Sequence, residues 1–322
     1  MATSPLPLGQ YLTLPAAERT WLVDQLIPTG GLVNLFSAPK QGKSYLVLDL
    51  ARALSQGDTC WLNQTIPRQA KVLYVQLDTP RSLWIDRFKK CQEAGVSFTT
   101  NDIGPDQPTE TEYFLVADME SAPFPFNICD PSCFAWLRDH INALKPELVV
   151  IDTIRETHDL DEDKAGPMKM VLTQLRAACM TITGLPPAIL IISHSRKTNP
   201  KADGGLMEEG RGANYVAERA EVVWRLVAKE GADTARLIYR GRATGHEVKV
   251  LKRNSKTILW ELQEDPMAAA KARWKADVAF MARHPDHAGK TLAERGRLLQ
   301  ALHTDKAHET CVAAIRRYKV PA

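Results

Sequence analysis

The chain has 322 residues, of which 44% are hydrophobic and 25% charged, so it has the composition of an ordinary globular protein with room for a full α/β core and a smaller second module. No apolar run reaches the roughly 18–20 residues of a membrane span, and the N-terminus has neither the basic nor the apolar segment of a secretory signal. The six scattered cysteines favour reduced thiols and a cytoplasmic location.

The first strong pattern is a phosphate-binding loop. The apolar run Leu32–Phe36 predicts a strand, the segment SAPKQGKS follows it, and a helical pattern covers Lys43–Leu54. In a GxxxxGK[ST] loop, backbone N–H groups and the helix N-terminus cradle phosphate oxygens. Ser37 stands here in place of the first glycine. The residues expected to bind nucleotide are Ser37, Pro39, Lys40, Gln41, Gly42, Lys43, Ser44 and Tyr45.

Within this loop, Lys43 is expected to contact the β- and γ-phosphates, and the Ser44 hydroxyl is expected to bind Mg²⁺. The sequence therefore predicts ATP and Mg²⁺ as cofactors.

The next apolar run, Val72–Leu77, predicts a second strand, which is followed by Asp78 and by a helical pattern over Ser82–Cys91. A carboxylate at the end of a strand next to the phosphate loop could serve as the general base that activates water. The alternative is that Asp78 caps the following helix, a common role for aspartate. The polar, Pro-containing segment Asn101–Thr111 is typical of a surface insertion.

A third apolar run, Leu148–Ile151, ends in Asp152, and a strand of this kind tipped by an acid holds the magnesium shell in P-loop enzymes. A helical pattern over Met168–Thr181 and the apolar run Ala188–Ile192 follow. These runs are apolar without alternation, as buried parallel strands are. Their alternation with helices predicts an α/β fold with a mostly parallel sheet flanked by helices.

The last elements complete the sheet and lead into a basic tail. Four shorter runs are strand candidates: Glu221–Val227, Thr234–Tyr239, Glu247–Leu251 and Ile258–Leu262. From Met267 onward the chain carries 11 Lys and Arg against 5 Asp and Glu. Such a segment is typical of contact with phosphate backbones, but equally of a solvated helical face.

We therefore expect a core over residues 1–264 and a basic helical module over residues 265–322. The segments TLAERGRLLQAL and KAHETCVAAIRRYK predict a helix-turn-helix or winged-helix unit within that module.

Five segments of the chain, in this order, resemble the RecA/DnaB-like ATPases: WLVDQLIPTGGLVNLFSAPKQGKS, YVQLDTP, VVIDTIRETHDLDEDKAGPM, ILIISHSRK and RGAN. The resemblance covers roughly Trp21–Leu262 and is strongest to plasmid RepA-type replicative helicases, which form hexameric rings. It implies a RecA-like fold, ATP hydrolysis with Mg²⁺, single-stranded DNA as a partner and a homo-oligomer, most simply a hexamer. The lack of a long apolar run, rather than the resemblance, predicts no membrane partner.

The resemblance also assigns roles to single positions. Lys43, Ser44 and Asp152 match the P-loop lysine, the P-loop hydroxyl and the acid that holds magnesium, and Asp78 falls where the family usually has a catalytic Glu. His194 matches a polar sensor of the γ-phosphate. The remaining assignments are basic residues, with Arg240 and Arg242 at positions that reach a neighbouring subunit's ATP, and Arg196, Lys197 and Lys201 in a loop that would hold single-stranded DNA.

Three functions are consistent with these features. The leading one is a ring-forming replicative DNA helicase of a plasmid or phage. A RecA-like DNA-binding ATPase that acts as a filament, loader or regulator without unwinding is the first alternative, and its basic tail would be the main DNA contact. The second alternative is a small-molecule kinase on a P-loop fold, which would act as a monomer.

Overall fold

The computed structural model describes residues 6–14, 19–98, 113–162, 164–180, 184–194, 213–229, 231–242 and 244–263, and then 274, 277–278, 281, 290–304 and 306–317. The chain forms two compact units, Met1–Leu262 and Gln263–Ala322. Within the described ranges, every helix is too short or too polar to span a bilayer.

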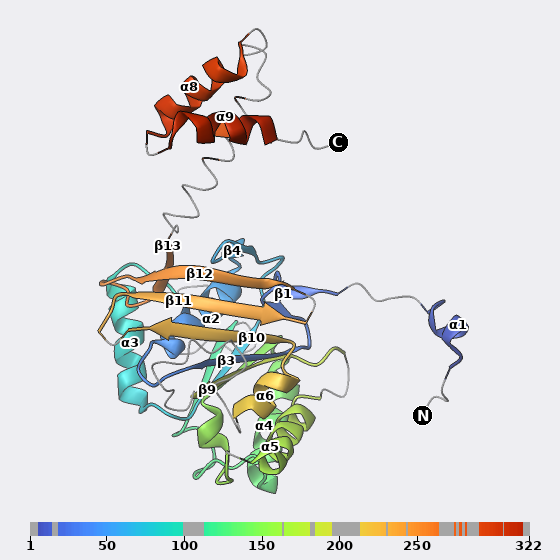
Figure 1. Cartoon of the computed structure of the whole chain (residues 1–322). Helices are drawn as coiled ribbons and strands as arrows, with labels where there is room; N and C mark the ends of the chain where they lie inside the picture. The colour runs from blue at the N-terminus through green and yellow to red at the C-terminus, as the bar shows by residue number, and fades with distance from the viewer. Residues whose placement is uncertain are drawn as a thin grey trace. The chain divides into compact units, whose positions relative to one another are not determined.

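The first unit is built on a nine-stranded sheet (Figure 1). Its strands lie in the order β13-β12-β11-β10-β3-β9-β8-β6-β7. The six strands from β10 to β7 are parallel to one another, and β11 and β12 continue the sheet antiparallel. The strands are β3 (Leu32–Ser37), β6 (Val72–Gln76), β7 (Phe114–Asp118), β8 (Leu148–Asp152), β9 (Ala188–His194), β10 (Val222–Ala228), β11 (Thr234–Gly241), β12 (His246–Arg253) and β13 (Trp260–Gln263).

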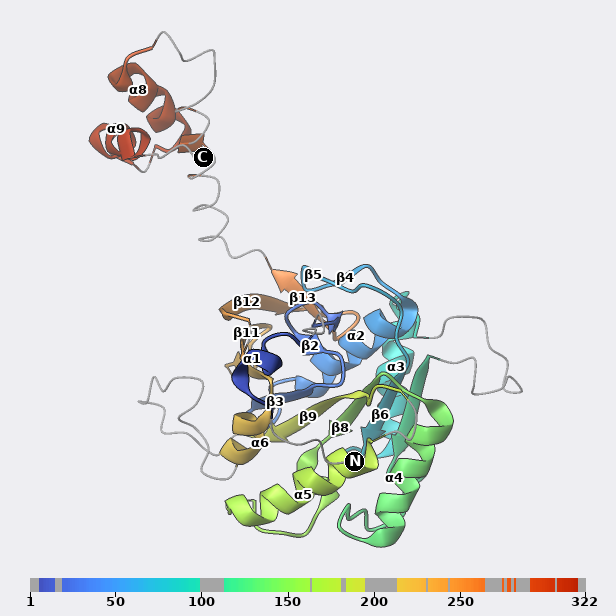
Figure 2. The ribbon, with the colours of Figure 1, turned by 90° about the vertical axis from the view of Figure 1, so that its right-hand side faces the viewer.

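Helices cover both faces of this sheet (Figures 1 and 2). One core cluster joins α2 and α3 to one face, and a second joins α4, α5 and α6 to the other. These helices are α2 (Lys43–Gln56), α3 (Arg81–Glu93), α4 (Pro131–Leu144), α5 (Ala165–Ala178) and α6 (Ala213–Arg219). Smaller elements are α1 (Leu8–Tyr11), the hairpins β1–β2 (Trp21–Val23, Ile27–Pro28) and β4–β5 (Cys60–Trp61, Gln64–Thr65), and a 3-10 helix at Ile154–Thr157.

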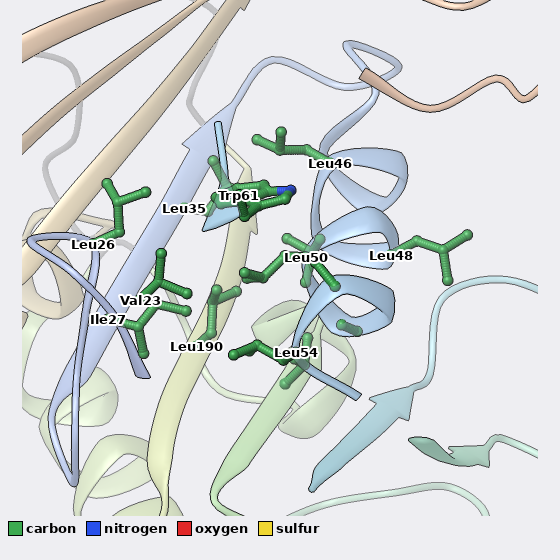
Figure 3. Packing of buried hydrophobic residues seen from close by; sticks show 14 of the residues in the cluster. Val23, Leu26, Ile27, Leu35, Leu46, Leu48, Leu50, Leu54, Trp61 and Leu190 are labelled. Atoms are coloured by element: carbon green, nitrogen blue, oxygen red, sulfur yellow. The ribbon is translucent and has the colours of Figure 1, made fainter. Parts of the chain in front are cut away.

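The position of α2 follows from its leucines. Leu46, Leu50 and Leu54 recur every four residues and share one face of the helix, which packs on Leu35 of β3 and Leu190 of β9 (Figure 3). All five side chains are fully buried. Burial of each leucine contributes about 1.5–3 kcal/mol, so the helix that begins at the phosphate loop is held firmly against the centre of the sheet.

The predicted α/β class with a mostly parallel sheet is confirmed, and each predicted strand forms within a few residues of its expected bounds. The larger elements that were missed are the edge strand β7 and the helices α4 and α6, and the smaller elements α1, β1–β2, β4–β5 and the 3-10 helix were not predicted either. A signal for α4 was present, because Asp130 caps the helix by accepting a hydrogen bond from Ser132 N at 2.8 Å, and a proline stands at its first position. The expected surface insertion Asn101–Thr111 lies outside the described residues.

The second unit contains α8 (Leu292–Leu302) and α9 (His308–Arg317), so the prediction of a small helical C-terminal module is confirmed. Thr291 and Glu294 form a capping box at the start of α8. The two helices approach closely at Gly296, where a Cβ would lie 2.4 Å from Val312 Cγ2. The unit has its own small core of Val278, Met281, Leu299, Cys311 and Ile315.

Candidate functional site

Four parallel strands end at one edge of the sheet and bring the predicted site residues together. Ser37 at the end of β3 is paired with His194 at the end of β9, and Asp152 at the end of β8 is paired with Gln76 at the end of β6. The loop from Ser37 to α2 begins at this edge. In open α/β sheets the carboxyl ends of the strands are where ligands bind, so this edge is the candidate site.

The backbone of the phosphate loop uses two left-handed residues. Gly42 has φ +85° and Lys40 has φ +62°, whereas Ser37 needs no positive φ. The glycine missing at position 37 is therefore not required for this conformation, which the sequence alone did not show. A left-handed conformation at position 42 is one that glycine adopts without strain, so the glycine before Lys43 is the one the geometry demands.

Lys43 is a buried cation held by neutral acceptors. Its side chain folds back over the loop, where Nζ contacts Ser37 Oγ at 3.1 Å and the carbonyl oxygens of Ser37 and Ala38 at 3.3 and 3.2 Å. Among the described residues, none of the carboxylates lies within ion-pair distance of Nζ. Burial lowers the pKa of Lys43 to about 8, although the charges of Asp152 and Asp78 oppose this shift. A buried ammonium surrounded by neutral acceptors fits a phosphate.

Ser44 and Asp152 form the hydroxyl and carboxylate pair that a magnesium site requires. Asp152 is 2% exposed, and burial raises its pKa, while hydrogen bonds from Tyr74 and Ser44 act in the opposite direction. The phenol of Tyr74 donates to Asp152 Oδ2 at 2.7 Å. Two oxygen donors of this kind fit Mg²⁺, which is usually held by one or two protein oxygens together with phosphate and water.

One face of β6 contributes two residues that sequence reasoning missed. Tyr74 and Gln76 alternate along the strand, so their side chains point to the same side, on which Tyr74 packs in the core cluster of α2 and α3. Gln76 is fully buried, and neither its amide oxygen nor its amide nitrogen has a hydrogen-bond partner in the part of the chain that the structure describes. Buried amides are nearly always satisfied by protein, water or ligand. The alternation of polar residues within VLYVQLD was the available signal.

Asp78 and His194 both lie close enough to Lys43 to interact with its charge. Asp78 is exposed just beyond the end of β6, and its charge acts on both Lys43 and His194. His194 Nδ1 lies 3.2 Å from Lys43 Nζ and accepts a hydrogen bond from it when the ring is neutral with its proton on Nε2. Burial, and then the charge of Lys43, lower the pKa of His194. A neutral imidazole beside the lysine is suited to hydrogen bonding with a phosphate oxygen.

An ion pair fixes the helix that follows Asp78. The guanidinium of Arg81, the first residue of α3, donates Nε–H to Asp118 Oδ2 at 2.5 Å and Nη2–H to Asp118 Oδ1 at 2.6 Å. This two-pronged hydrogen bond is the main reason that the pKa of Asp118 is lowered to about 2. The loop carrying Asp78 is therefore anchored to the end of β7. Asp78 does not cap α3, because Pro80 is the N-cap residue and no side chain bonds there.

The ring of Tyr45 lies between two guanidinium groups beside the phosphate loop. Arg87 Cζ of α3 is 5.0 Å from the ring centroid, and Arg253 Cζ at the end of β12 is 4.5 Å from it. These cation–π contacts join α3 and the antiparallel part of the sheet to the first turn of α2.

Arg240 and Arg242 lie near the amino ends of the parallel strands, at the side of the sheet opposite to the carboxyl ends where the site residues gather. Gly241 between them aligns through β10 with Val33, four residues before Ser37 in β3. A rise of about 3.3 Å per residue and a strand spacing of about 4.8 Å put the two arginines roughly 16 Å from the start of the phosphate loop. This is farther than an arginine side chain extends.

Both arginines are exposed, and Arg242 Nη2 donates to the carbonyl oxygen of Glu218 in α6 at 2.6 Å. The structure therefore does not bring Arg240 and Arg242 to the nucleotide site of their own chain. Arg196, Lys197 and Lys201, predicted to contact DNA, lie outside the described residues.

Solved structures with the same arrangement include a DnaB-like replicative helicase that was studied with its interactions with primase. It is 11% identical, with a TM-score of 0.51 over 72% of this chain and 57% of that chain. This chain thus spans little more than half the length of that helicase. A KaiC-like protein from the hyperthermophilic archaeon Pyrococcus horikoshii OT3 is 14% identical, with a TM-score of 0.49 over 75% of this chain and 93% of that chain. A search of curated proteins gave no match.

At such low identities a structural likeness shows the fold alone, which is the predicted RecA-like P-loop fold. The sequence also matches a family model described as an AAA domain over residues 2–200, more than half of the chain. This match includes the phosphate loop, Asp78, Asp152 and His194. The chain therefore belongs to the AAA domain family.

Proposed function

We propose that this protein is an ATP-hydrolysing motor that acts on single-stranded DNA, and that it works as a homo-oligomeric ring, a hexamer, in the manner of a RepA-type replicative helicase of a plasmid or phage. The single observation that carries the oligomeric part is the separation of Arg240 and Arg242 from the phosphate loop of their own chain. Exposed arginines at the far edge of the sheet are available to a neighbouring subunit.

Each chain would supply most of the nucleotide site. Lys43 exchanges its neutral partners for phosphate oxygens, and Ser44 and Asp152 hold Mg²⁺, which neutralises charge on the β- and γ-phosphates when bound. Asp78 accepts the proton of the attacking water. The shorter aspartate in place of glutamate moves this carboxylate back by one methylene, so we expect slow turnover. His194 contacts the γ-phosphate and senses its loss.

The neighbouring chain would supply the remaining charge. An arginine donated in trans stabilises the transferring phosphoryl group and can be worth about 10³–10⁵ in rate. Arg240 and Arg242 are proposed for this role. In the free chain Arg242 is engaged with the Glu218 carbonyl, so assembly would have to replace that hydrogen bond.

Assembly and unwinding are tested together. Negative-stain images with a non-hydrolysable nucleotide and Mg²⁺ should show six-fold rings, and a forked duplex should be separated in the presence of ATP. Rings that hydrolyse ATP in response to single strands but never separate them would exclude the helicase and leave the ATPase. A monomer with full activity would instead support the small-molecule kinase.

A second candidate is a DNA-binding ATPase that does not unwind, and the C-terminal unit favours it. This unit has its own small core, a helix pair whose first member is capped, and an excess of basic residues. Removal of the chain after Asp265 separates the two candidates. Loss of all DNA affinity would support the regulator or loader, whereas single-strand binding that persists in the core and falls when Arg196, Lys197 and Lys201 become Ala would support the motor.

A further inference from the structure

A buried tryptophan from the end of the core contacts the phosphate loop from outside. Trp260 of β13 is 3% exposed, and its indole Nε1–H donates to the carbonyl oxygen of Gly42 at 3.0 Å, across 218 positions of sequence. The ring lies directly against the glycine. A Cβ at position 42 would come 2.9 Å from Nε1 and 3.0 Å from Cζ2 of the indole, closer than real Cβ atoms tolerate.

The bond acts on the peptide unit that joins Gly42 to Lys43. In a planar trans peptide the carbonyl and the next amide N–H point in opposite directions, so holding one fixes the other. In a phosphate loop the N–H groups face the phosphate and the carbonyls face away. Leu46 N also donates to the Gly42 carbonyl, at 3.2 Å, in the first turn of α2. Trp260 occupies the second acceptor site of that oxygen.

A second bond ties the adjacent residue to the same side of the sheet. Gln41 Nε2 donates to the carbonyl oxygen of Ala228, the last residue of β10, at 2.8 Å. Two consecutive loop residues are therefore anchored on their outer side, one by β10 and the other by β13.

We propose that Trp260 is a positioning residue for nucleotide binding, whose indole N–H holds the Gly42–Lys43 peptide so that the Lys43 amide N–H faces the phosphates. This inference rests on the proposed nucleotide-binding function of the loop. It also gives Gly42 a second requirement besides its positive φ, because any side chain at that position would collide with the indole.

The test compares two tryptophan-to-phenylalanine variants by calorimetric titration with ADP, with and without Mg²⁺. Trp260→Phe keeps an aromatic ring in the core but removes the N–H. Trp224→Phe is the matched control, because Trp224 is fully buried in the same core cluster and its Nε1 has no partner among the described residues.

Trp260→Phe should weaken ADP binding about threefold to tenfold, as expected for the loss of one neutral hydrogen bond, and Trp224→Phe should change it less than twofold. The KM for ATP should rise by the same factor while kcat stays within twofold, since substrate and transition state both use the loop N–H. General damage to the core would not raise KM while leaving kcat unchanged.

The outcomes separate this inference from the function on which it rests. Wild-type protein that binds no ADP would overturn both, whereas Trp260→Phe protein that binds ADP within twofold of wild type would overturn the role of Trp260 alone. If Trp260→Phe lowers the thermal midpoint more than the control does, benzothienylalanine at position 260 keeps the bicyclic ring and removes only the N–H. ADP binding by this variant within twofold of wild type would then overturn the role of Trp260.

Discussion

Removal of the Tyr74 hydroxyl, which is hydrogen-bonded to Asp152, should raise the Mg²⁺ concentration that this protein needs for half-maximal nucleotide binding and hydrolysis. Tyr74 donates its phenol hydrogen to Asp152 Oδ2 at 2.7 Å, and both side chains are buried. Tyr74→Phe keeps the ring in place against Trp84, whose centroid is 4.9 Å away, and takes away only the donor. The substitution therefore isolates the support that the phenol gives to the Asp152 carboxylate, the proposed magnesium ligand.

The magnitude follows from the burial of that carboxylate. Burial already raises the pKa of Asp152, and the Tyr74 hydrogen bond counteracts the rise. A hydrogen bond to a charged group is worth about 1.5–3 kcal/mol, and each 1.4 kcal/mol corresponds to about tenfold in an equilibrium constant. Because the protonated carboxyl competes with the metal, the Mg²⁺ concentration for half-saturation should rise about tenfold or more near pH 7. It should recover as the pH is raised.

The assay is a Mg²⁺ titration of ADP binding and of ATP hydrolysis at two pH values, with metal-free ADP binding as a reference that should not change. Tyr239→Phe is the control, since Tyr239 is a buried phenol in the same sheet that donates to Glu247 instead. If Tyr74→Phe protein is well folded and needs no more Mg²⁺ than the control at either pH, the phenol does not support the site.

Three further predictions follow from the pKa shifts and from the arginine positions. Lys43→Met should abolish ADP binding yet raise the thermal midpoint of the ligand-free protein at pH 7. The folded-state pKa of Lys43, about 8, lies below its ordinary value of 10.5, so the buried ammonium destabilises the fold below pH 8 and this cost disappears as the pH rises from 8 to 10.5. In buffers of different ionisation enthalpy, calorimetry on wild type above pH 8 should show proton uptake with ADP; none would contradict the shift. Asp118→Asn should reduce the fall in the free energy of unfolding at acid pH, measured by urea titration at several pH values. The folded-state pKa of Asp118, about 2, lies below its ordinary value of 3.8, so the stabilisation is present above pH 3.8 and is lost as the pH falls toward 2. A variant with the same acid dependence as wild type would refute this. Arg242→Ala should bind nucleotide normally but hydrolyse it slowly, and mixing it with Asp78→Asn protein should restore some turnover; no restoration would argue against trans catalysis.

Local patterns in the sequence were sufficient for the scaffold of this protein. Apolar runs without alternation predicted the central parallel strands, and the SAPKQGKS segment between a strand and a helix predicted the phosphate loop. These features depend on neighbours close in the chain, namely the burial of a strand on both faces and the N–H groups at a helix start. The elements that lay outside these patterns, among them β7, α4 and α6, were missed.

Tertiary structure decided which side chains support the site. Tyr74 meets Asp152 across 78 positions, and Trp260 meets Gly42 across 218, because strand order and the packing of β13 bring them together. It also assigned Arg242 to the edge away from the phosphate loop, since β11 runs antiparallel to β3. No spacing rule encodes such pairings. The sequence by itself determined the position of the predicted phosphate loop. Only the folded sheet decided what holds this loop and Asp152 in place, because those contacts are made between strands far apart in the chain.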